Sequence, residues 1–313
     1  MVTRSRLRSF ARYAHPRHWP LWFGLAVLYL LIQLPYPILV RLGGWLGRRS
    51  MRFLKRRVGI ARRNLELCFP EIDSHQQQVK LTEHFSSLGI ALLETGMAWF
   101  WPDKRIKKWI DIVGLEHLHN TQESASDQQN GVMVIGVHFM TLELHFRILG
   151  HCKPMVVMYR PHNSPILEWV QKWGRSRSGN VLVNRKNLIS MVHTLKRGGT
   201  VWFAPDQDNG AKGSVFVPFF GVDKAATSNG TFTIARLAQP KLVTAVVIRK
   251  PAGQGYQLMI SPELEHYPYD NSLAAAAYMN RAIEREIMKA PGQYLWLHRR
   301  FKTRPVGEPS LYI

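Results

Sequence analysis

Residues 131–144 read GVMVIGVHFMTLEL, and the first half of this stretch decides the fold class. Residues 131–137 form a short continuous apolar run, which is typical of a strand buried on both faces of a parallel sheet. Similar apolar runs follow at residues 154–159, 200–204, 242–248 and 257–260. Helical stretches lie between or after them at residues 165–173, 188–196 and 272–288. This alternation predicts an α/β fold with a central, mostly parallel sheet flanked by helices.

The part of the chain before this run has a helical pattern. Ser74, with Gln77 three residues later, has the spacing of a capping box, which predicts that a helix starts there. A polar, turn-rich segment, NTQESASDQQN at residues 120–130, predicts a surface loop. The expected organisation is a basic tail and anchor (1–42) and a single domain (43–313) with a helical part (43–118) and an α/β catalytic core (131–313).

The first fifth of the chain has a charge pattern of its own. The protein carries 42 Lys and Arg against 21 Asp and Glu, which gives a net charge of +21 and a pI near 10.4. Fourteen of these basic residues lie at or before Arg63, whereas no acidic residue precedes Glu66. The same stretch contains an uncharged apolar run at residues 21–40. A basic segment around an apolar one favours an anionic membrane surface as the partner and argues against nucleic acid.

The apolar run at residues 21–40 has about the length of ~20 residues that a membrane-spanning helix needs. Gln33, Pro35 and Pro37 weaken its second half, because proline interrupts the helical hydrogen-bond ladder. We expect one N-terminal hydrophobic membrane-anchor helix, spanning or half-inserted, that holds the rest of the chain on the cytoplasmic face. The alternative interpretation is a helix buried in the core.

Polar residues follow two of the predicted strands directly. His138 comes immediately after residues 131–137, and Asp206 immediately after TVWFAP, residues 200–205. Reactive groups in α/β sheets usually lie at such strand ends. Glu143 follows His138 by five residues, so the two can meet only if His138 lies in the turn before the helix that contains Glu143. We predict that Glu143 orients the imidazole of a general base, His138. A purely structural His–Glu pair is the alternative.

Several other catalytic motifs are absent from the sequence. The chain has no G-x-S-x-G elbow, no H-E-x-x-H and no P-loop, and His138 has no Cys or His neighbour at metal-ligand spacing. Its two cysteines, Cys68 and Cys152, form no C-x-x-C pair, and we expect buried thiols in a reducing compartment. A base without a protein nucleophile indicates direct attack by a substrate hydroxyl, with no metal and no cofactor.

The block VHFMTLEL resembles the H-x4-D/E motif of the glycerolipid acyltransferase superfamily. From about residue 16 to the C-terminus, the chain is similar to one branch, the late lipid A acyltransferases of Gram-negative bacteria. The segments that carry the resemblance are LLETGMAWFWP, GVHFMTLEL, YRPHNSPILEWVQKWGRSRS, VWFAPDQDNG, VFVPFFGV and QYLWLHRRFKTRP. One departure is DQD at residues 206–208, where the wider superfamily has a Glu-Gly-Thr phosphate-binding block. A saccharolipid acceptor therefore fits this chain better than glycerol phosphate.

The resemblance implies a reaction at the bacterial inner membrane. Enzymes of this branch transfer a lauroyl or palmitoleoyl chain from acyl carrier protein to the 3-hydroxyl of a hydroxyacyl chain of Kdo2-lipid IVA. The resemblance implies that His138 is the base and that Glu143 orients and stabilises its ring. It also implies that Arg175 contacts the oxyanion or a lipid phosphate, and that Asp206 positions Arg175 or the acceptor sugar. For Arg175 and Asp206 an ordinary ion pair is the alternative, and the donor chain length stays open.

Two further sets of residues are candidates for substrate contacts. One set could bind the acceptor headgroup or form a solvated basic face: His298, Arg299, Arg300 and Lys302. The aromatic pair Phe219 and Phe220 lines the acyl channel or, more in keeping with such runs, packs in the core. Two other functions compete with acyl transfer. A non-catalytic basic module that binds lipid or nucleic acid would keep its function without His138, and a hydrolase would release free fatty acid without any acceptor.

Overall fold

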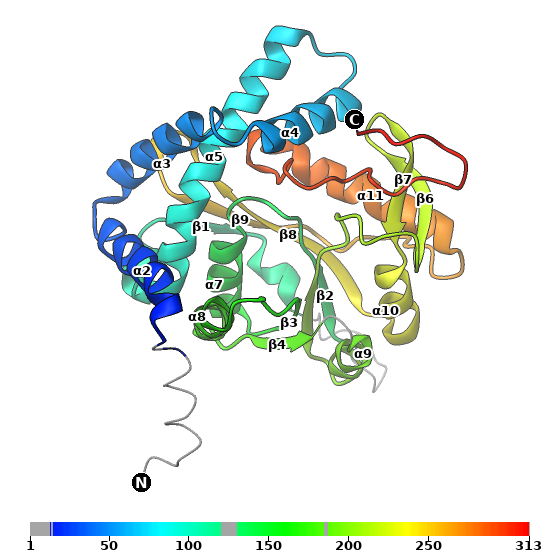
Figure 1. Ribbon diagram of the computed structural model, residues 1–313. Helices are drawn as coiled ribbons and strands as arrows, with labels where there is room; N and C mark the ends of the chain where they lie inside the picture. Colours follow the sequence, from blue (N-terminus) through cyan, green and yellow to red (C-terminus); the bar gives the residue numbers. More distant parts are fainter. Residues whose placement is uncertain (1–12, 14, 120–129, 185–186, 313) are drawn as a thin grey trace.

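Seven strands form the central sheet of the computed structural model, which describes residues 13, 15–119, 130–184 and 187–312 (Figure 1). Their order across the sheet is β1-β9-β8-β2-β5-β3-β4. Their bounds are β1 Ile110–Val113, β2 Val132–Ile135, β3 Val156–Tyr159, β4 Val181–Asn184, β5 Thr200–Phe203, β8 Lys241–Arg249 and β9 Tyr256–Ile260. All neighbours pair in parallel except β8 and β9, which are antiparallel. The predicted α/β fold with a mostly parallel sheet is confirmed.

Helices cover both faces of this sheet, and a separate antiparallel hairpin adjoins it. The hairpin consists of β6 Ser214–Phe219 and β7 Val222–Ser228. The α-helices are α2 Trp19–Leu31, α3 Tyr36–Ser50, α4 Lys55–Cys68, α5 Ser74–Phe100, α6 Asp103–Lys107, α7 Leu142–Cys152, α8 Pro165–Ser176, α9 Leu188–Lys196, α10 Gly230–Ala238 and α11 Ser272–Met288. Short 3-10 turns are η1 Pro16–His18, η2 Leu115–Leu118, η3 Pro251–Gly253 and η4 Pro291–Gln293.

Strand β2 shows why the apolar runs are continuous. Successive side chains of a strand point to opposite faces of a sheet. Val132 and Val134 therefore join the core formed with α2, α3, α7 and α8, whereas Met133 and Ile135 join the core formed with α4, α9, α10 and α11. All four side chains are fully buried. A strand covered on both faces must be apolar at every position.

Helix α5 links the two cores, and glycines set its distance from α3. A Cβ atom on Gly47 would lie 1.9 Å from the carbonyl oxygen of Phe85, and one on Gly89 would lie 2.1 Å from the carbonyl oxygen of Gly43. Such approaches are possible only without a side chain. The predicted start of α5 is correct at Ser74, but its cap differs, because Asp73 accepts the hydrogen bond from the amide of Gln76.

The predicted membrane-anchor helix is wrong as a spanning helix. The apolar run breaks after Leu31, and Pro35 caps a second helix, α3, whose first turn contains Pro37. Proline cannot supply the amide hydrogen that a continuous helix needs at these positions. In the described part of the chain, no helix is both long and apolar enough to cross a membrane. Ile32 and Tyr36, beside the break, are instead buried in the core.

The two cysteines are both free thiols, in line with the sequence. Cys68 is buried at the end of α4, and burial raises the pKa of its thiol well above the usual range. Cys152 is only half-buried at the end of α7, so for this residue the predicted full burial is wrong.

A buried imidazole makes the stability of this fold dependent on pH. His145 on α7 is fully buried and its Nε2 accepts a hydrogen bond from the indole of Trp202. Burial lowers the pKa of His145 to about 3, from about 6.5 in an unfolded chain. Between these values the unfolded state binds more protons than the folded state. The resulting stability is complete above about pH 6.5 and declines as the pH falls toward 3.

We therefore expect the Tm to fall as the pH is lowered from about 6.5 to 4. The variant His145→Gln keeps a hydrogen-bond acceptor for Trp202 but cannot be protonated, so its Tm should change less over the same range. His193→Gln, at an exposed position on α9, is the matched control and should keep the wild-type slope. Equal slopes for all three proteins in a thermal melt series would show that His145 does not contribute.

Candidate active site

The loop after β2 carries His138 past a tryptophan side chain. A Cβ atom on Gly136 would lie 2.1 Å from the indole ring of Trp202, so only glycine lets the chain pass this ring. The Trp202 ring then lies edge-on to the imidazole of His138, with 6.3 Å between ring centres. His138 thus leaves the sheet in the turn between β2 and α7, as its sequence position predicts.

His138 is held by the carboxylate of Asp206, which lies just beyond the end of β5. Its Nδ1 is 2.6 Å from Oδ1 of Asp206, and its backbone amide donates to Oδ2 at 3.0 Å. Asp206 is completely buried, whereas the His138 side chain keeps 22% of its exposure. Burial raises the pKa of Asp206, but the neighbouring charge of His138 and its two hydrogen bonds lower it further, so the pKa is below its usual value. The carboxylate is therefore ionised near neutral pH.

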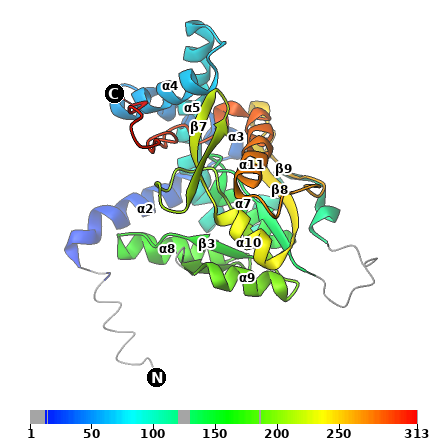
Figure 2. The same ribbon diagram turned by 90° about the vertical axis from the view of Figure 1, so that its right-hand side faces the viewer.

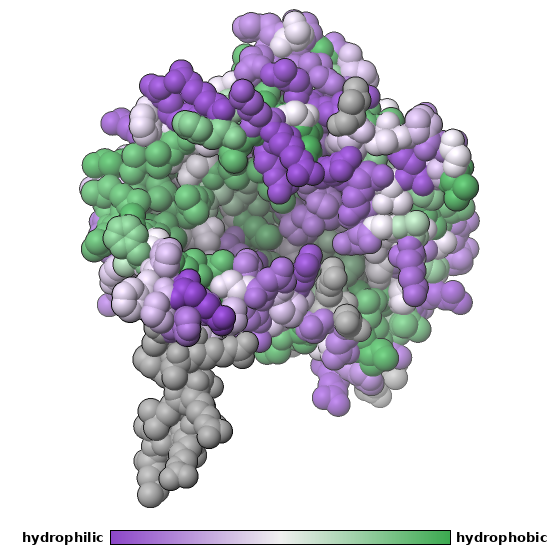
Figure 3. Space-filling view, viewed as in Figure 1, coloured by the Kyte–Doolittle hydropathy of each residue, from purple (hydrophilic) through white to green (hydrophobic). Residues whose placement is uncertain are grey.

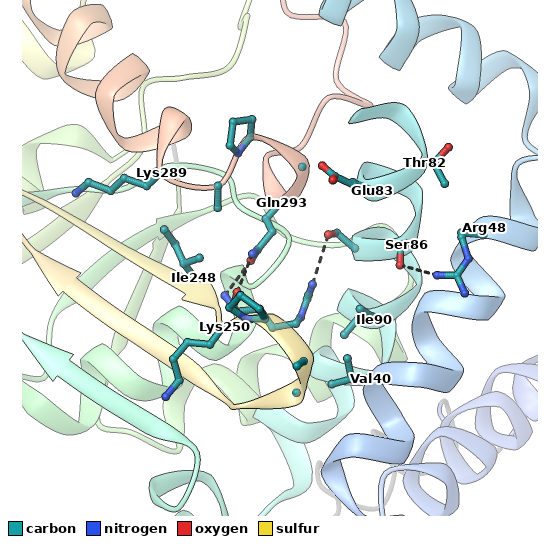
Figure 4. Close-up of a pocket in the computed structure, with 18 residues that line it drawn as sticks. Val40, Arg48, Thr82, Glu83, Ser86, Ile90, Ile248, Lys250, Lys289 and Gln293 are labelled. Atoms are coloured by element: carbon teal, nitrogen blue, oxygen red, sulfur yellow. Dashed lines mark hydrogen bonds between the residues drawn. The ribbon is translucent and has the colours of Figure 1, made fainter. Parts of the chain in front are cut away.

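A third segment, around η4, fixes the same loop from the other side. The amide of Met140 donates to the carbonyl of Gln293, and the carbonyl of His138 accepts from the amide of Leu295. The side chain of Gln293 in turn binds both the amide and the carbonyl of Arg249, at the end of β8. Figure 4 shows the side chain of Gln293 and its hydrogen bonds at the edge of a cavity of about 680 Å³ between α3, α5 and η4. The loop that carries His138 is thus connected to the sheet at β2, β5 and β8.

The loop after Asp206 has its own hydrogen-bond network. The buried carboxylate of Asp208 accepts from the amide and hydroxyl of Thr303, and its amide donates to Nε2 of His298. Burial lowers the pKa of His298 to about 4, so the ring is neutral and can accept this bond. His298 therefore supports the loop. Its predicted role as a headgroup contact has no support in this arrangement.

Glu143 lies in the first turn of α7 and binds a different partner from the one predicted. Its carboxylate accepts from Nε and Nη2 of Arg175 on α8, at 3.1 and 2.5 Å, and from the indole of Trp99 at 2.9 Å. The guanidinium of Arg175 stacks over Phe146, with 4.8 Å to the ring centre. Gly174 lets the Trp99 ring lie against α8, since a Cβ atom at this position would be 2.3 Å from that ring.

The four predicted residues therefore meet in other pairs than the sequence suggested. We predicted that Glu143 orients His138 and that Asp206 positions Arg175 or a sugar. The structure pairs His138 with Asp206 and Glu143 with Arg175. The reason is geometric: Asp206 follows β5, which is the hydrogen-bonded neighbour of β2, so the two strand ends lie side by side. Glu143, one turn into α7, faces α8 instead.

Two of the other candidate contacts belong to the core. Arg300 is 2% exposed, donates to the carbonyl of Ala226 and lies over the ring of Phe219. It has almost no exposed surface with which to contact a headgroup, because its guanidinium group is buried and hydrogen-bonded inside the protein. Phe219 is fully buried, which confirms the core interpretation for that residue. Phe220 is half-buried against Phe69 and Trp296, and Lys302 is exposed.

Sequence reasoning missed the residues that hold the site together. Trp99, Trp202 and Gln293 carry no catalytic motif, and their roles depend on contacts between segments far apart in the chain. The sequence offered one indirect indication of the two tryptophans. Gly136 lies against the ring of Trp202, and Gly174 lies against the ring of Trp99.

This arrangement has the chemistry of a general base. A carboxylate bound to Nδ1 holds the proton on that nitrogen and leaves the lone pair of Nε2 outward. Nε2 of His138 has no hydrogen-bond partner among the described residues. The fold and site are thus those of an α/β protein with a His–Asp pair that can accept a proton from a ligand, and with a separate carboxylate–arginine pair, Glu143–Arg175.

Comparison with known proteins identifies the family. The chain belongs to the bacterial lipid A biosynthesis acyltransferases, whose family model matches residues 8–303. It is 56% identical to the lipid A biosynthesis palmitoleoyltransferase of Escherichia coli K12, over 97% of this chain and 98% of that protein. It is 49% identical to the lauroyltransferase of the same strain, over 95% and 96%. A Haemophilus influenzae lipid A biosynthesis acyltransferase is 43% identical, over 95% of each chain. The protein is therefore an O-acyltransferase of lipid A biosynthesis.

Because Asp206 pairs with His138 and Glu143 pairs with Arg175, we expect removal of the two negative charges to have different effects. Asp206→Asn should lower the rate of acyl transfer about 10²–10⁴-fold, because an amide neither holds the right tautomer nor stabilises imidazolium. It should also change the pH profile. Glu143→Gln, a substitution of matched kind, should lower the rate without that change, because it loosens Arg175 and leaves the base intact. Steady-state rates across pH 5–9 provide the measurement, and an altered profile for Glu143→Gln alone would support the pairing that we predicted from sequence.

Proposed function

We propose that this enzyme transfers a fatty acyl chain from acyl carrier protein to the 3-hydroxyl of a hydroxyacyl chain of Kdo2-lipid IVA. The observation that carries the proposal is the His138–Asp206 pair with an unoccupied Nε2. A base of this kind, in a member of the lipid A acyltransferase family, suits the activation of a hydroxyl group. The high net charge of +21 suits both an acidic carrier protein and an acceptor with phosphates and carboxylates.

In the proposed reaction, Nε2 of His138 takes the proton from the acceptor hydroxyl as its oxygen attacks the thioester carbon. Negative charge moves to the carbonyl oxygen, and the imidazolium is stabilised by the ionised Asp206. When the tetrahedral intermediate collapses, the C–S bond breaks. The imidazolium then returns its proton to the leaving thiolate, so the ester and the free thiol are the products. No acyl-enzyme is formed on this route.

Arg175 is the candidate for binding the negative charge that develops. Glu143 occupies Nε and Nη2 of its guanidinium, which leaves Nη1 for an anionic group. The side chain is 10% exposed and its orientation is fixed by Glu143 and by the ring of Phe146. A donor held in one orientation contributes more to catalysis than a mobile one, because it need not reorganise during the reaction.

We infer palmitoleoyl as the donor chain in preference to lauroyl. The support is the higher identity to the palmitoleoyltransferase, 56% against 49% over nearly the same length.

A direct test is expression of this chain in Gram-negative cells that lack their own late acyltransferases. Mass spectrometry of the lipid A should show one added palmitoleoyl group, and His138→Ala should remove it, because loss of a general base costs about 10²–10⁴ in rate. An added lauroyl group would contradict the donor. Unmodified lipid A with free fatty acid released in vitro would indicate a hydrolase and contradict the proposal as a whole.

We also propose that the enzyme lies on the inner membrane with the α2–α3 face half-inserted. Figure 3 shows apolar side chains gathered over these helices on one face of the molecule. Trp19, Phe23 and Leu30 are 64%, 73% and 68% exposed. Further exposed apolar residues of the same helices are Val27, Tyr29, Ile38, Trp45 and Leu46. A patch of this extent, next to a basic segment, suits the interface of an anionic bilayer.

Apolar insertion should resist salt, whereas purely electrostatic binding is screened by it. Wild-type enzyme should therefore stay with membranes that are washed in molar salt. Phe23→Asp combined with Leu30→Asp should let the same wash release the protein. Ile189→Asp with Val181→Asp, exposed apolar positions elsewhere in the fold, is the matched control and should remain bound. Release of the wild type by salt alone would contradict insertion of this face.

A further inference from the structure

Four arginine side chains surround one pocket between α4 and the C-terminal segment. The pocket has a volume of about 430 Å³. Arg56, Arg62 and Arg63 line it from α4, and Arg299 lines it from the segment after η4. The other lining residues are Gly59, Ile60, Glu66 and Tyr312. Four guanidinium groups thus face one carboxylate, which leaves an excess of about three positive charges in one small concave site.

Most of this charge has no acidic partner in the described part of the chain. Arg63 is paired with Glu66 at 3.2 Å and donates to the carbonyl of Leu311. Arg62 has only the neutral amide of Gln78, at 3.3 Å. Arg299 lies over the ring of Tyr312, and its Nε is buried without a hydrogen-bond partner. An unsatisfied buried donor costs free energy.

The pocket is open above Gly59. Gly59 lies in the middle of α4, where glycine weakens a helix by about 0.5–1 kcal/mol relative to alanine. A Cβ atom at Gly59 would meet no atom within 4 Å, so the space above it is free. Guanidinium groups that converge on such a space match the oxygens of a phosphate, which accepts paired N–H bonds in one plane.

The pocket is coupled to the catalytic base through short connections. Arg299 directly follows His298, whose ring accepts from the amide of Asp208, two residues beyond Asp206. On the helix side, the buried amide of Asn64 donates to the carbonyls of Trp296 and His298, both at 2.7 Å. The pocket and the loop that holds the base therefore share one rigid support.

We propose that this pocket binds a phosphate group of the acceptor's sugar headgroup and so positions the acceptor for deprotonation. The inference rests on the proposed saccharolipid acceptor and identifies where its anionic end binds. Figure 2 places α2 and α4 toward the same side of the molecule, at different heights. Phe53, two residues before the start of α4, is 84% exposed. The concave form of the pocket suits a compact anion better than the surface of a carrier protein.

The test compares the double variant Arg56→Gln/Arg62→Gln with wild type in neutral detergent micelles, which carry no surface charge. Both side chains are exposed and neither has an ion pair in the described structure, so folding should be unaffected. The KM for Kdo2-lipid IVA should rise about tenfold or more, since each bond between charged groups contributes appreciably. The KM for the acyl donor should not change. Lys196→Gln/Arg197→Gln, which removes two exposed charges at the end of α9, should leave both constants unchanged.

An acceptor stripped of its phosphates separates the possible causes. Wild type and the double variant should use this acceptor with the same KM, because the group that the arginines bind is gone. A higher KM for acyl carrier protein donor, but not for a short acyl-pantetheine donor, would assign the pocket to the carrier protein and overturn the proposal. Equal losses with both acceptors, or no loss, would also overturn it. Failure of the wild type itself to acylate Kdo2-lipid IVA would instead contradict the proposed function.

Discussion

The site depends on one interaction, the pair of hydrogen bonds between the buried carboxylate of Asp206 and His138. One carboxylate oxygen holds the ring of His138 and the other holds the backbone amide of the same residue. A buried charge is costly unless it is compensated, so both bonds must be made for the fold to tolerate it. The carboxylate thus fixes the position and the tautomer of the base together, and the loop after β2 is tied to the end of β5.

Most strands of the sheet, and the positions of His138 and Asp206 just after two of them, could be predicted from local patterns. Continuous apolar runs mark strands covered on both faces, and they place His138 and Asp206 at strand ends. Four strands, β1, β4, β6 and β7, were missed. Strand β4, for example, lies at an edge of the sheet with Val181 57% exposed, and its apolar run has only three residues, 181–183, which is shorter than the run at β2.

The pairing of the site residues could not be predicted, because it depends on strand order. Five residues of sequence separate His138 from Glu143, and 68 separate His138 from Asp206. Asp206 is farther from His138 in the sequence, but it contacts His138 in the fold because β2 and β5 are neighbouring strands. The prediction of a spanning helix at residues 21–40 was wrong for a different reason. The hydropathy of this run indicated an anchor, but the prolines after Leu31 divide it into two helices, and backbone geometry takes precedence over composition.

Two separate ion pairs give the site a division of labour that one dyad would lack. If Glu143 and Asp206 both contacted His138, two negative charges would compete for one ring, and Arg175 would have no fixed orientation. Because α7 turns Glu143 toward α8, His138 keeps the buried carboxylate of Asp206, and Arg175 keeps the partly exposed carboxylate of Glu143. In the proposed reaction, proton transfer and stabilisation of the developing negative charge can then be tuned independently. The glycines at 136 and 174 make this separation possible, since each admits a tryptophan ring that fills the space between the elements.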